Sequence, residues 1–168
     1  MQTEPMRAFH GDTRLKDRML IEIGRHEAAD QIVGGVYSRG TGKTWKGCAI
    51  GCSLHSLNRI TRRPGRSVED DVDIHARYPA ELGIPQTIAR LEDTIFERLP
   101  ADRQKTWPRL VIDAITPGAD LSGVWPRFAV RLLTRVKTRF DCTKWVAQAD
   151  AIDTVILMFQ AEIDGRPP

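Results

Sequence analysis

The stretch Gly47-Cys48-Ala49-Ile50-Gly51-Cys52-Ser53-Leu54-His55 places small, apolar and reactive side chains at helical spacing, and it predicts a helix over residues 48–60. On such a helix Cys48, Cys52 and His55 occupy positions i, i+4 and i+7, so they share one face. The glycines and the alanine of this stretch let a neighbouring helix approach closely. We therefore expect a helix that packs inside a helical protein, with two thiols and an imidazole on one side.

Helical periodicity continues on both sides of this stretch. Asp12 or Thr13 can cap a first helix, Gly34-Gly35 can end it, and Pro85 suits a helix start. The last helix carries an apolar stripe made of Trp145, Ala149, Ile152, Ile156, Phe159 and Ile163. The predicted helices besides 48–60 cover residues 13–33, 85–99, 101–115, 121–140 and 143–163.

No segment shows the spacing of strands and turns that is typical of a β protein. The sequence therefore predicts an all-α fold, in which residues 1–168 form a single helical domain. We expect an irregular or orthogonal bundle of about six helices. Residues 62–79 contain Pro64-Gly65 and the acidic run Glu69-Asp70-Asp71-Val72-Asp73, and we expect them to form an exposed charged loop.

Composition favours a soluble folded protein. Of its 168 residues 41% are hydrophobic and 28% are charged, which argues against disorder. No apolar run approaches the ~20 residues of a membrane span, so we expect no membrane partner. The N-terminus shows no basic and apolar signal segment, and three cysteines cannot all pair within one chain. We therefore expect a cytoplasmic protein with reduced thiols.

Basic residues are concentrated in the segment 39–66. Seven lysines and arginines and no acid lie between Gln31 and Val68, although the net charge of the whole chain is only +3. This segment could bind nucleic acid, and its candidate face consists of Arg59, Arg62, Arg63 and Arg66. The alternative, which we favour, is a solvated loop neutralised by the acidic run, because no aromatic residue lies between these arginines to stack on bases.

Cys48, Cys52 and His55 could also hold a metal ion. Two thiols and an imidazole are ligands that zinc prefers, and a structural zinc site needs a fourth ligand. His10, His26 or His75 could supply that ligand, and His26 is our candidate because it forms a second two-ligand helix face with Asp30 at i+4. A single Cys-x3-Cys pair differs from the two separated Cys/His pairs that structural zinc sites usually use. Zinc is therefore a possible cofactor of this cluster.

The same cluster resembles the active-site helix of the alkylhydroperoxidase D-like family. Gly47, Cys48 and His55 match the Gly-Cys-x-x-Cys-x-x-x-His segment of that family, and the second cysteine stands one place later, at Cys52. Val36 and Tyr37 occupy the region of the family's acidic residue. The resemblance covers about nine residues and implies an all-α core and thiol redox chemistry. It would make Cys48 the reactive thiol, Cys52 its resolving partner and His55 the proton shuttle.

Packing is the interpretation of this cluster that we favour, because free cysteine is often buried as a small hydrophobe. Over its length the chain also resembles small bacterial and prophage proteins, a likeness that implies no activity. Our leading hypothesis is a binding or regulatory module that acts by protein contacts, through a partner or by self-association. A basic nucleic-acid face would be a further property of that module. The alternative is a small thiol-redox or metal-dependent enzyme centred on Cys48, Cys52 and His55.

Overall fold

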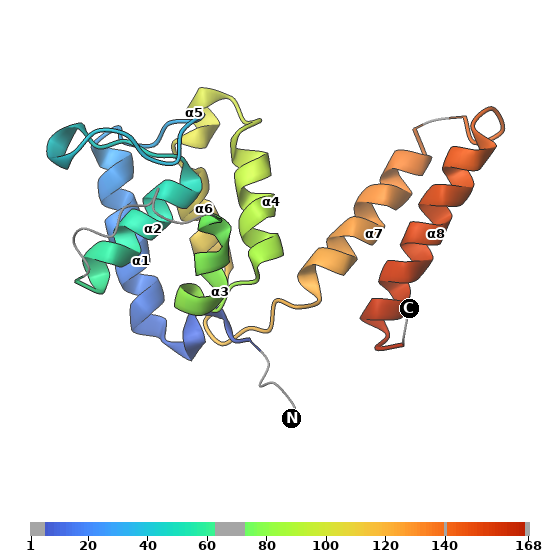
Figure 1. Cartoon of the computed structure of the whole chain (residues 1–168), viewed down its shortest axis with the longest axis horizontal. Helices are drawn as coiled ribbons and strands as arrows, with labels where there is room; N and C mark the ends of the chain where they lie inside the picture. The colour runs from blue at the N-terminus through green and yellow to red at the C-terminus, as the bar shows by residue number, and fades with distance from the viewer. Residues whose placement is uncertain (1–5, 63–72, 140, 167–168) are drawn as a thin grey trace. The chain divides into compact units, whose positions relative to one another are not determined.

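The computed structural model describes residues 6–62, 73–139 and 141–166. These residues form eight α-helices and no strand, which confirms the predicted all-α class (Figure 1). Contacts within the chain divide it into two compact units, 1–120 and 121–168. One folding domain over 1–168 stays a prediction. None of the described helices combines the length and the hydropathy that a transmembrane helix requires.

The first unit contains six of these helices. They are α1 (Thr13–Ala28), α2 (Ala49–Ile60), α3 (Arg77–Leu82), α4 (Gln86–Phe96), α5 (Ala101–Gln104) and α6 (Trp107–Ala114). Among the described residues of this unit, three short 3-10 helices accompany them: η1 (Ala8–Gly11), η2 (Gly42–Thr44) and η4 (Ile74–Ala76). Asp12 caps α1 as predicted, because its side chain accepts a hydrogen bond from the Arg14 amide at 2.8 Å.

The helix α1 ends at Ala28, five residues earlier than we predicted. Asp30 has a positive φ of 51°, which turns the chain out of the helix. The following residues pair with the segment before α2: the Val33 amide donates to the Gly47 carbonyl, and the Gly47 amide donates to the Gln31 carbonyl, both at 2.9 Å. The two ends of the loop between α1 and α2 therefore lie side by side, joined by backbone hydrogen bonds. The prediction that Gly34-Gly35 ends the first helix was wrong.

The core of this unit surrounds α2. Helix α2 packs against α1, α4 and α6, and the predicted helix over 48–60 is confirmed with its start one residue later. Burying a large apolar side chain contributes roughly 1.5–3 kcal/mol, so the fully buried set stabilises the unit strongly. Its largest members are Tyr78, Phe9, Phe96, Met19, Ile23, Ile50, Leu54, Leu57, Leu82, Ile84 and Ile112.

The prediction that residues 62–79 form an exposed loop was wrong for residues 73–79, which are the described residues at its C-terminal end. Residues 63–72 lie outside the described residues, whereas residues 73–79 include η4 and the first turn of α3. Tyr78 is fully buried, and Arg77 is 4% exposed because its guanidinium bonds Glu81 and Asn58. We expected Pro79 to mark the end of a loop, but it lies in the first turn of α3, where a proline is tolerated.

The second unit is a helical hairpin. Helices α7 (Val124–Lys137) and α8 (Val146–Ile163) lie side by side and run antiparallel (Figure 1). Trp145 of the predicted stripe is exposed. The other five residues of the stripe are buried or half-buried, whereas most residues of α8 are exposed; these five are Ala149, Ile152, Ile156, Phe159 and Ile163. Phe159 meets the ring of Trp125 edge to face, with the ring centroids 6.4 Å apart. The helical period thus identified the side of α8 that faces α7.

Candidate functional site

The start of α2 is held against the loop of residues 35–37. The Cys48 amide donates to the Val36 carbonyl at 2.9 Å, and the Gly35 amide donates to the Glu97 carboxylate at 2.8 Å. A side chain at position 51 would clash, because a Cβ on Gly51 would lie 1.7 Å from the carbonyl oxygen of Tyr37. The glycine therefore allows the loop to lie on α2, next to the end of α4.

Cys48 occupies the N-cap of α2. Its Sγ atom accepts a hydrogen bond from the Gly51 amide at 3.5 Å, and the residue is 1% exposed. Burial raises the pKa of the Cys48 thiol to about 12, outweighing the Gly51 hydrogen bond, and the charges of Asp93 and Glu97 raise it further. A helix N-terminus usually lowers a thiol pKa, but desolvation is the larger effect here.

Cys52 is a packed thiol as well. Its Sγ atom donates to the Gly47 carbonyl at 3.5 Å, and burial raises its pKa well above the ordinary value. The thiolate is the nucleophile in thiol chemistry, so two buried thiols with raised pKa values lack the activation that the redox hypothesis requires. The third thiol, Cys142, is half-buried and belongs to the second unit.

Cys48 lies beside two carboxylates that were not among the residues selected from the sequence. The ligand atoms of Cys48, Asp93 and Glu97 all lie within 4.8 Å of one another, the one such group of three among the described residues. Asp93 and Glu97 also line a hollow of about 290 Å³, together with Gly35, Val36 and Tyr37. Their spacing of four residues along the predicted helix over 85–99 was the signal that could have identified them.

Asp93 is fixed from one side. Its Oδ2 atom lies 3.1 Å from Nε2 of His75, whose Nδ1 lies 3.2 Å from the Asp73 carboxylate. Its Oδ1 atom is buried and has no partner at hydrogen-bond distance among the described residues, and the Tyr37 hydroxyl adjoins the same carboxyl. An oriented carboxylate with a free oxygen beside a thiol and a second carboxylate is a donor set that a divalent cation can use.

His55 does not join the thiols in such a group. Its Nδ1 lies 3.1 Å from Nε2 of His26, and Nδ1 of His26 lies 2.7 Å from Oε1 of Gln31. With that amide oxygen as acceptor, a neutral His26 donates to Gln31 through Nδ1 and accepts from Nδ1–H of His55 through Nε2. The His55 ring also stacks on Trp45 at 4.1 Å between centroids.

The environment of this pair keeps both rings uncharged. Burial lowers the pKa of His55 to about 4, and the neighbouring His26 and Arg59 lower it further. Burial also lowers the pKa of His26, against the opposing hydrogen bond with Gln31. The predicted ligand set of Cys48, Cys52, His55 and His26 is thus divided between two places, and each histidine already uses one ring nitrogen on the other.

A buried carboxyl lies one residue before Asp93. Glu92 is 3% exposed, accepts a hydrogen bond from the Tyr78 hydroxyl at 3.2 Å, and has no partner at Oε1 among the described residues. Burial raises the pKa of Glu92 to about 8, so the neutral acid is its stable form over much of the physiological range. Helical periodicity did not identify this position, although α4 buries Glu92 together with Ala89 and Phe96.

The proposed nucleic-acid face is described only in part. Arg59 forms an ion pair with Glu22 at 3.0 Å, and Arg25 binds the same carboxylate. Arg62 follows the end of α2 with a positive φ of 54°, while Arg63 and Arg66 lie outside the described residues. One of the four candidate arginines is therefore engaged with a neighbouring helix.

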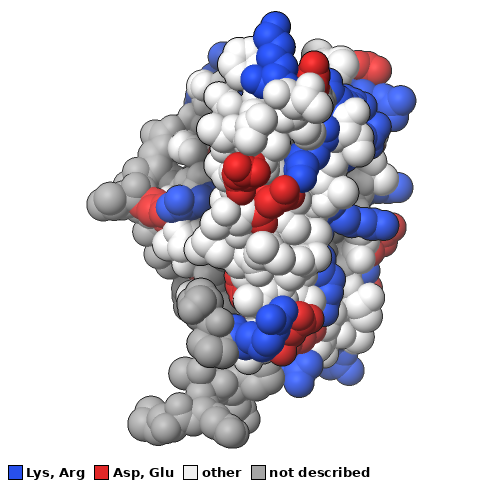
Figure 2. Space-filling view, turned by 90° about the vertical axis from the view of Figure 1, so that its right-hand side faces the viewer, with Lys and Arg blue, Asp and Glu red and all other residues white. Residues whose placement is uncertain are grey.

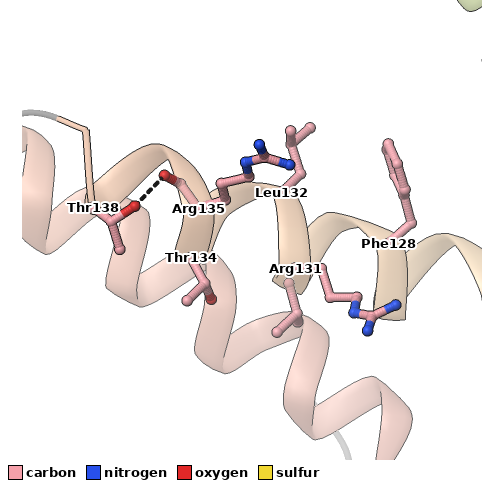
Figure 3. A pocket seen from close by; sticks show the side chains of 7 residues that line it. Phe128, Arg131, Leu132, Thr134, Arg135 and Thr138 are labelled. Atoms are coloured by element: carbon pink, nitrogen blue, oxygen red, sulfur yellow. Dashed lines mark hydrogen bonds between the residues drawn. The ribbon is translucent and has the colours of Figure 1, made fainter.

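The hairpin exposes apolar residues on its outer surface. Leu157 is 65% exposed and Met158 is 54% exposed, although both lie in α8 well away from its ends. Charged groups on this side of the molecule are separated by wide areas of uncharged residues (Figure 2). On α7 a hollow of about 730 Å³ is lined by Phe128, Val130, Arg131, Leu132, Thr134, Arg135 and Thr138 (Figure 3).

Opposite charges are divided between the two helices of the hairpin. Helix α7 carries Arg127, Arg131, Arg135 and Lys137 and no acid, whereas α8 carries Asp150, Asp153 and Glu162 and no base. Lys137 and Asp153 form an ion pair at 2.5 Å across the hairpin. The remaining charges of the two helices form no ion pair with any residue that the structure describes.

Comparison with known proteins adds no assignment, since no protein-family model, no curated protein and no solved structure matches this chain.

Proposed function

We propose that this protein is a binding module that acts by protein contacts, and that its partner is a second copy of the same chain, docked hairpin to hairpin. One observation carries this proposal: α8 has apolar side chains on its outer as well as its inner side. A helix that is hydrophobic all round is typical of a buried position. In the single chain, however, Ala149 is the one buried residue of α8.

In a pair of packed helices, each helix buries only the side that faces the other helix. In this hairpin the inner side of α8 is used by α7, so Val146, Leu157 and Met158 stay in water. Exposing a large apolar side chain forfeits roughly 1.5–3 kcal/mol that burial would supply. A second hairpin would cover these residues and complete a four-helix bundle, which is a common way for such pairs to form a core.

A second copy suits this surface because the hairpin is complementary to itself. It carries a basic helix and an acidic helix, so two hairpins related by a twofold axis present opposite charges to each other. An unrelated partner would need to supply both an apolar surface and the matching charges. We further propose that the module works in the cytoplasm, where a reducing environment keeps its three free cysteines as thiols.

The experiment compares two substitutions of exposed apolar residues. Leu157→Glu places a charge in the proposed interface, and Ile21→Glu makes the same kind of change at a 57% exposed residue of α1 in the first unit. Sedimentation velocity of the full chain should show a dimer for the wild type and for Ile21→Glu, and a shift to monomer for Leu157→Glu. Equal self-association of both variants would refute the proposal.

A second candidate function is the binding of a divalent metal ion by Cys48, Asp93 and Glu97. It is favoured by the mutual distances of the three ligand atoms, the adjoining hollow and the unpartnered Oδ1 of Asp93. A thiolate and two carboxylates form a donor set that zinc accepts. This candidate replaces the ligand set expected from the sequence, in which Cys52, His26 and His55 took part.

A further inference from the structure

We propose that α7 of one copy lies against α8 of the other, so that Leu157 and Met158 enter the hollow beside Leu132 while the free arginines of α7 face the free acids of α8. This inference rests on the proposed function, because it specifies how the two hairpins pair. Both contacts occur twice in a twofold dimer, since each copy offers one α7 and one α8.

The arginines of α7 form a single row. Arg127, Arg131 and Arg135 follow one another at intervals of four residues, which places them along one line on the helix surface. Arg131 and Arg135 line the hollow, and Leu132 and Phe128 supply its apolar part (Figure 3). Lys137, the fourth base, is already paired with Asp153. The row is thus a basic border beside an apolar depression.

The outer surface of α8 carries the matching pattern. Asp150, Thr154, Met158 and Glu162 also follow at intervals of four residues, so two acids lie on one line with an exposed methionine. Leu157 adjoins Met158 and is the most exposed large hydrophobic residue of the described chain. An apolar ridge between two acids complements an apolar depression beside a row of arginines.

The alternative pairing of like helices is disfavoured by charge. Placing α7 against α7 would bring arginines of the two copies together, and placing α8 against α8 would bring acids together. Like charges held close in an interface weaken association strongly. Pairing α7 with α8 leaves no like-charged helices in direct contact at either of the two symmetric interfaces.

The test uses two variants of the full chain, each of which reverses charges on one helix. Arg131→Glu with Arg135→Glu makes α7 less basic, and Asp150→Lys with Glu162→Lys makes α8 basic. Because all four positions are exposed, the fold should persist, which circular dichroism can verify. The matched control is Arg14→Glu with Arg18→Glu, two exposed arginines at the same spacing on α1.

Each reversed variant alone should self-associate at least about tenfold more weakly than the wild type, and the control should not. Mixed together, the two variants should form a heterodimer, which native mass spectrometry detects by its mass. A reversed α7 variant that dimerises like the wild type, or a mixture that stays monomeric, would overturn the pairing. A monomeric wild type would instead contradict the proposed function, so the two failures are distinguishable.

Discussion

The Lys137 ammonium lies 2.5 Å from the Asp153 carboxylate and joins α7 to α8. This pair uses one base of a helix that has no acid and one acid of a helix that has no base. The hydrogen bond with Asp153 raises the pKa of Lys137, so the ammonium stays charged at neutral pH. The attraction between a base of α7 and an acid of α8 thus acts within the hairpin, and we propose the same kind of attraction between two copies.

Reversing one partner of this ion pair should weaken the hairpin. Lys137→Glu would place two carboxylates across α7 and α8, and we expect a lower midpoint of thermal unfolding. The change should be modest, because both side chains are partly in water and exposed pairs contribute little. Lys137→Glu combined with Asp153→Lys should restore most of the midpoint in circular dichroism melts. A double variant no better than the single one would show that the charges do not interact.

Gly51 should tolerate no side chain. A Cβ at this position would meet the Tyr37 carbonyl, so Gly51→Ala has to displace the loop of residues 35–37 or the start of α2. We expect a loss of roughly 1–3 kcal/mol in the free energy of unfolding, the usual range for overpacking.

The matched control for that substitution lies in α1. A Cβ added to Gly24 would have no neighbouring atom within 4 Å, so Gly24→Ala gains helix propensity without a clash. It should stabilise the protein by about 1 kcal/mol in urea unfolding. If both substitutions shifted the unfolding midpoint in the same direction, the close approach at Gly51 would not be the cause.

Glu92 should make the protein less stable as the pH rises. Its pKa is raised from 4.5 to about 8 in the folded state, so the folded protein retains a proton that the unfolded chain releases in this interval. The free energy of unfolding therefore falls with rising pH, by at most about 1.4 kcal/mol per unit, and levels off above about pH 8.

The clearest window for this effect lies between about pH 6.5, the ordinary pKa of histidine, and about pH 8. At lower pH the lowered pKa values of His55 and His26 act in the opposite direction, because the unfolded chain then binds protons that the folded protein does not bind. Glu92→Gln cannot ionise, so its urea unfolding should be nearly independent of pH in this window. Parallel pH profiles of the variant and the wild type would contradict the assignment.

Zinc binding should depend on the carboxylates of α4 and not on the histidine pair. Equilibrium dialysis against zinc followed by elemental analysis should find one ion per chain if the second candidate function holds. Cys48→Ser and Glu97→Gln should lose that ion, because each removes one ligand. His55→Ala should keep it, since His55 bonds His26 instead. Loss of zinc in His55→Ala, or no zinc in the wild type, would exclude this site.

Helical period and capping residues were enough to predict most helices of this fold. The stripe of α8 and the cap at Asp12 follow from residues that are close in sequence, and the structure confirms both. Pro108 lies in the first turn of α6, a position that suits a proline. The return of the loop before α2 was not predictable, because it depends on backbone pairing between Val33 and Gly47.

The candidate sites were harder to infer from the sequence. The spacing of Cys48, Cys52 and His55 correctly indicated a helix, but spacing cannot say which neighbouring helix each side chain meets. The burial of Glu92 was not predicted, because the buried side of a helix is expected to carry apolar residues. Its burial is compatible with the fold because the neutral acid accepts a hydrogen bond from Tyr78, a tertiary contact that periodicity does not encode.

If the α7–α8 hairpin docks on the hairpin of a second copy, the particle in solution has the molar mass of two chains. Light scattering after size-exclusion chromatography measures that mass over a range of protein concentrations. We predict a mass twice the 18.9 kDa of one chain, with the monomer appearing on dilution. A mass of one chain at every concentration, with Leu157 and Met158 left in water, would contradict the proposed dimer.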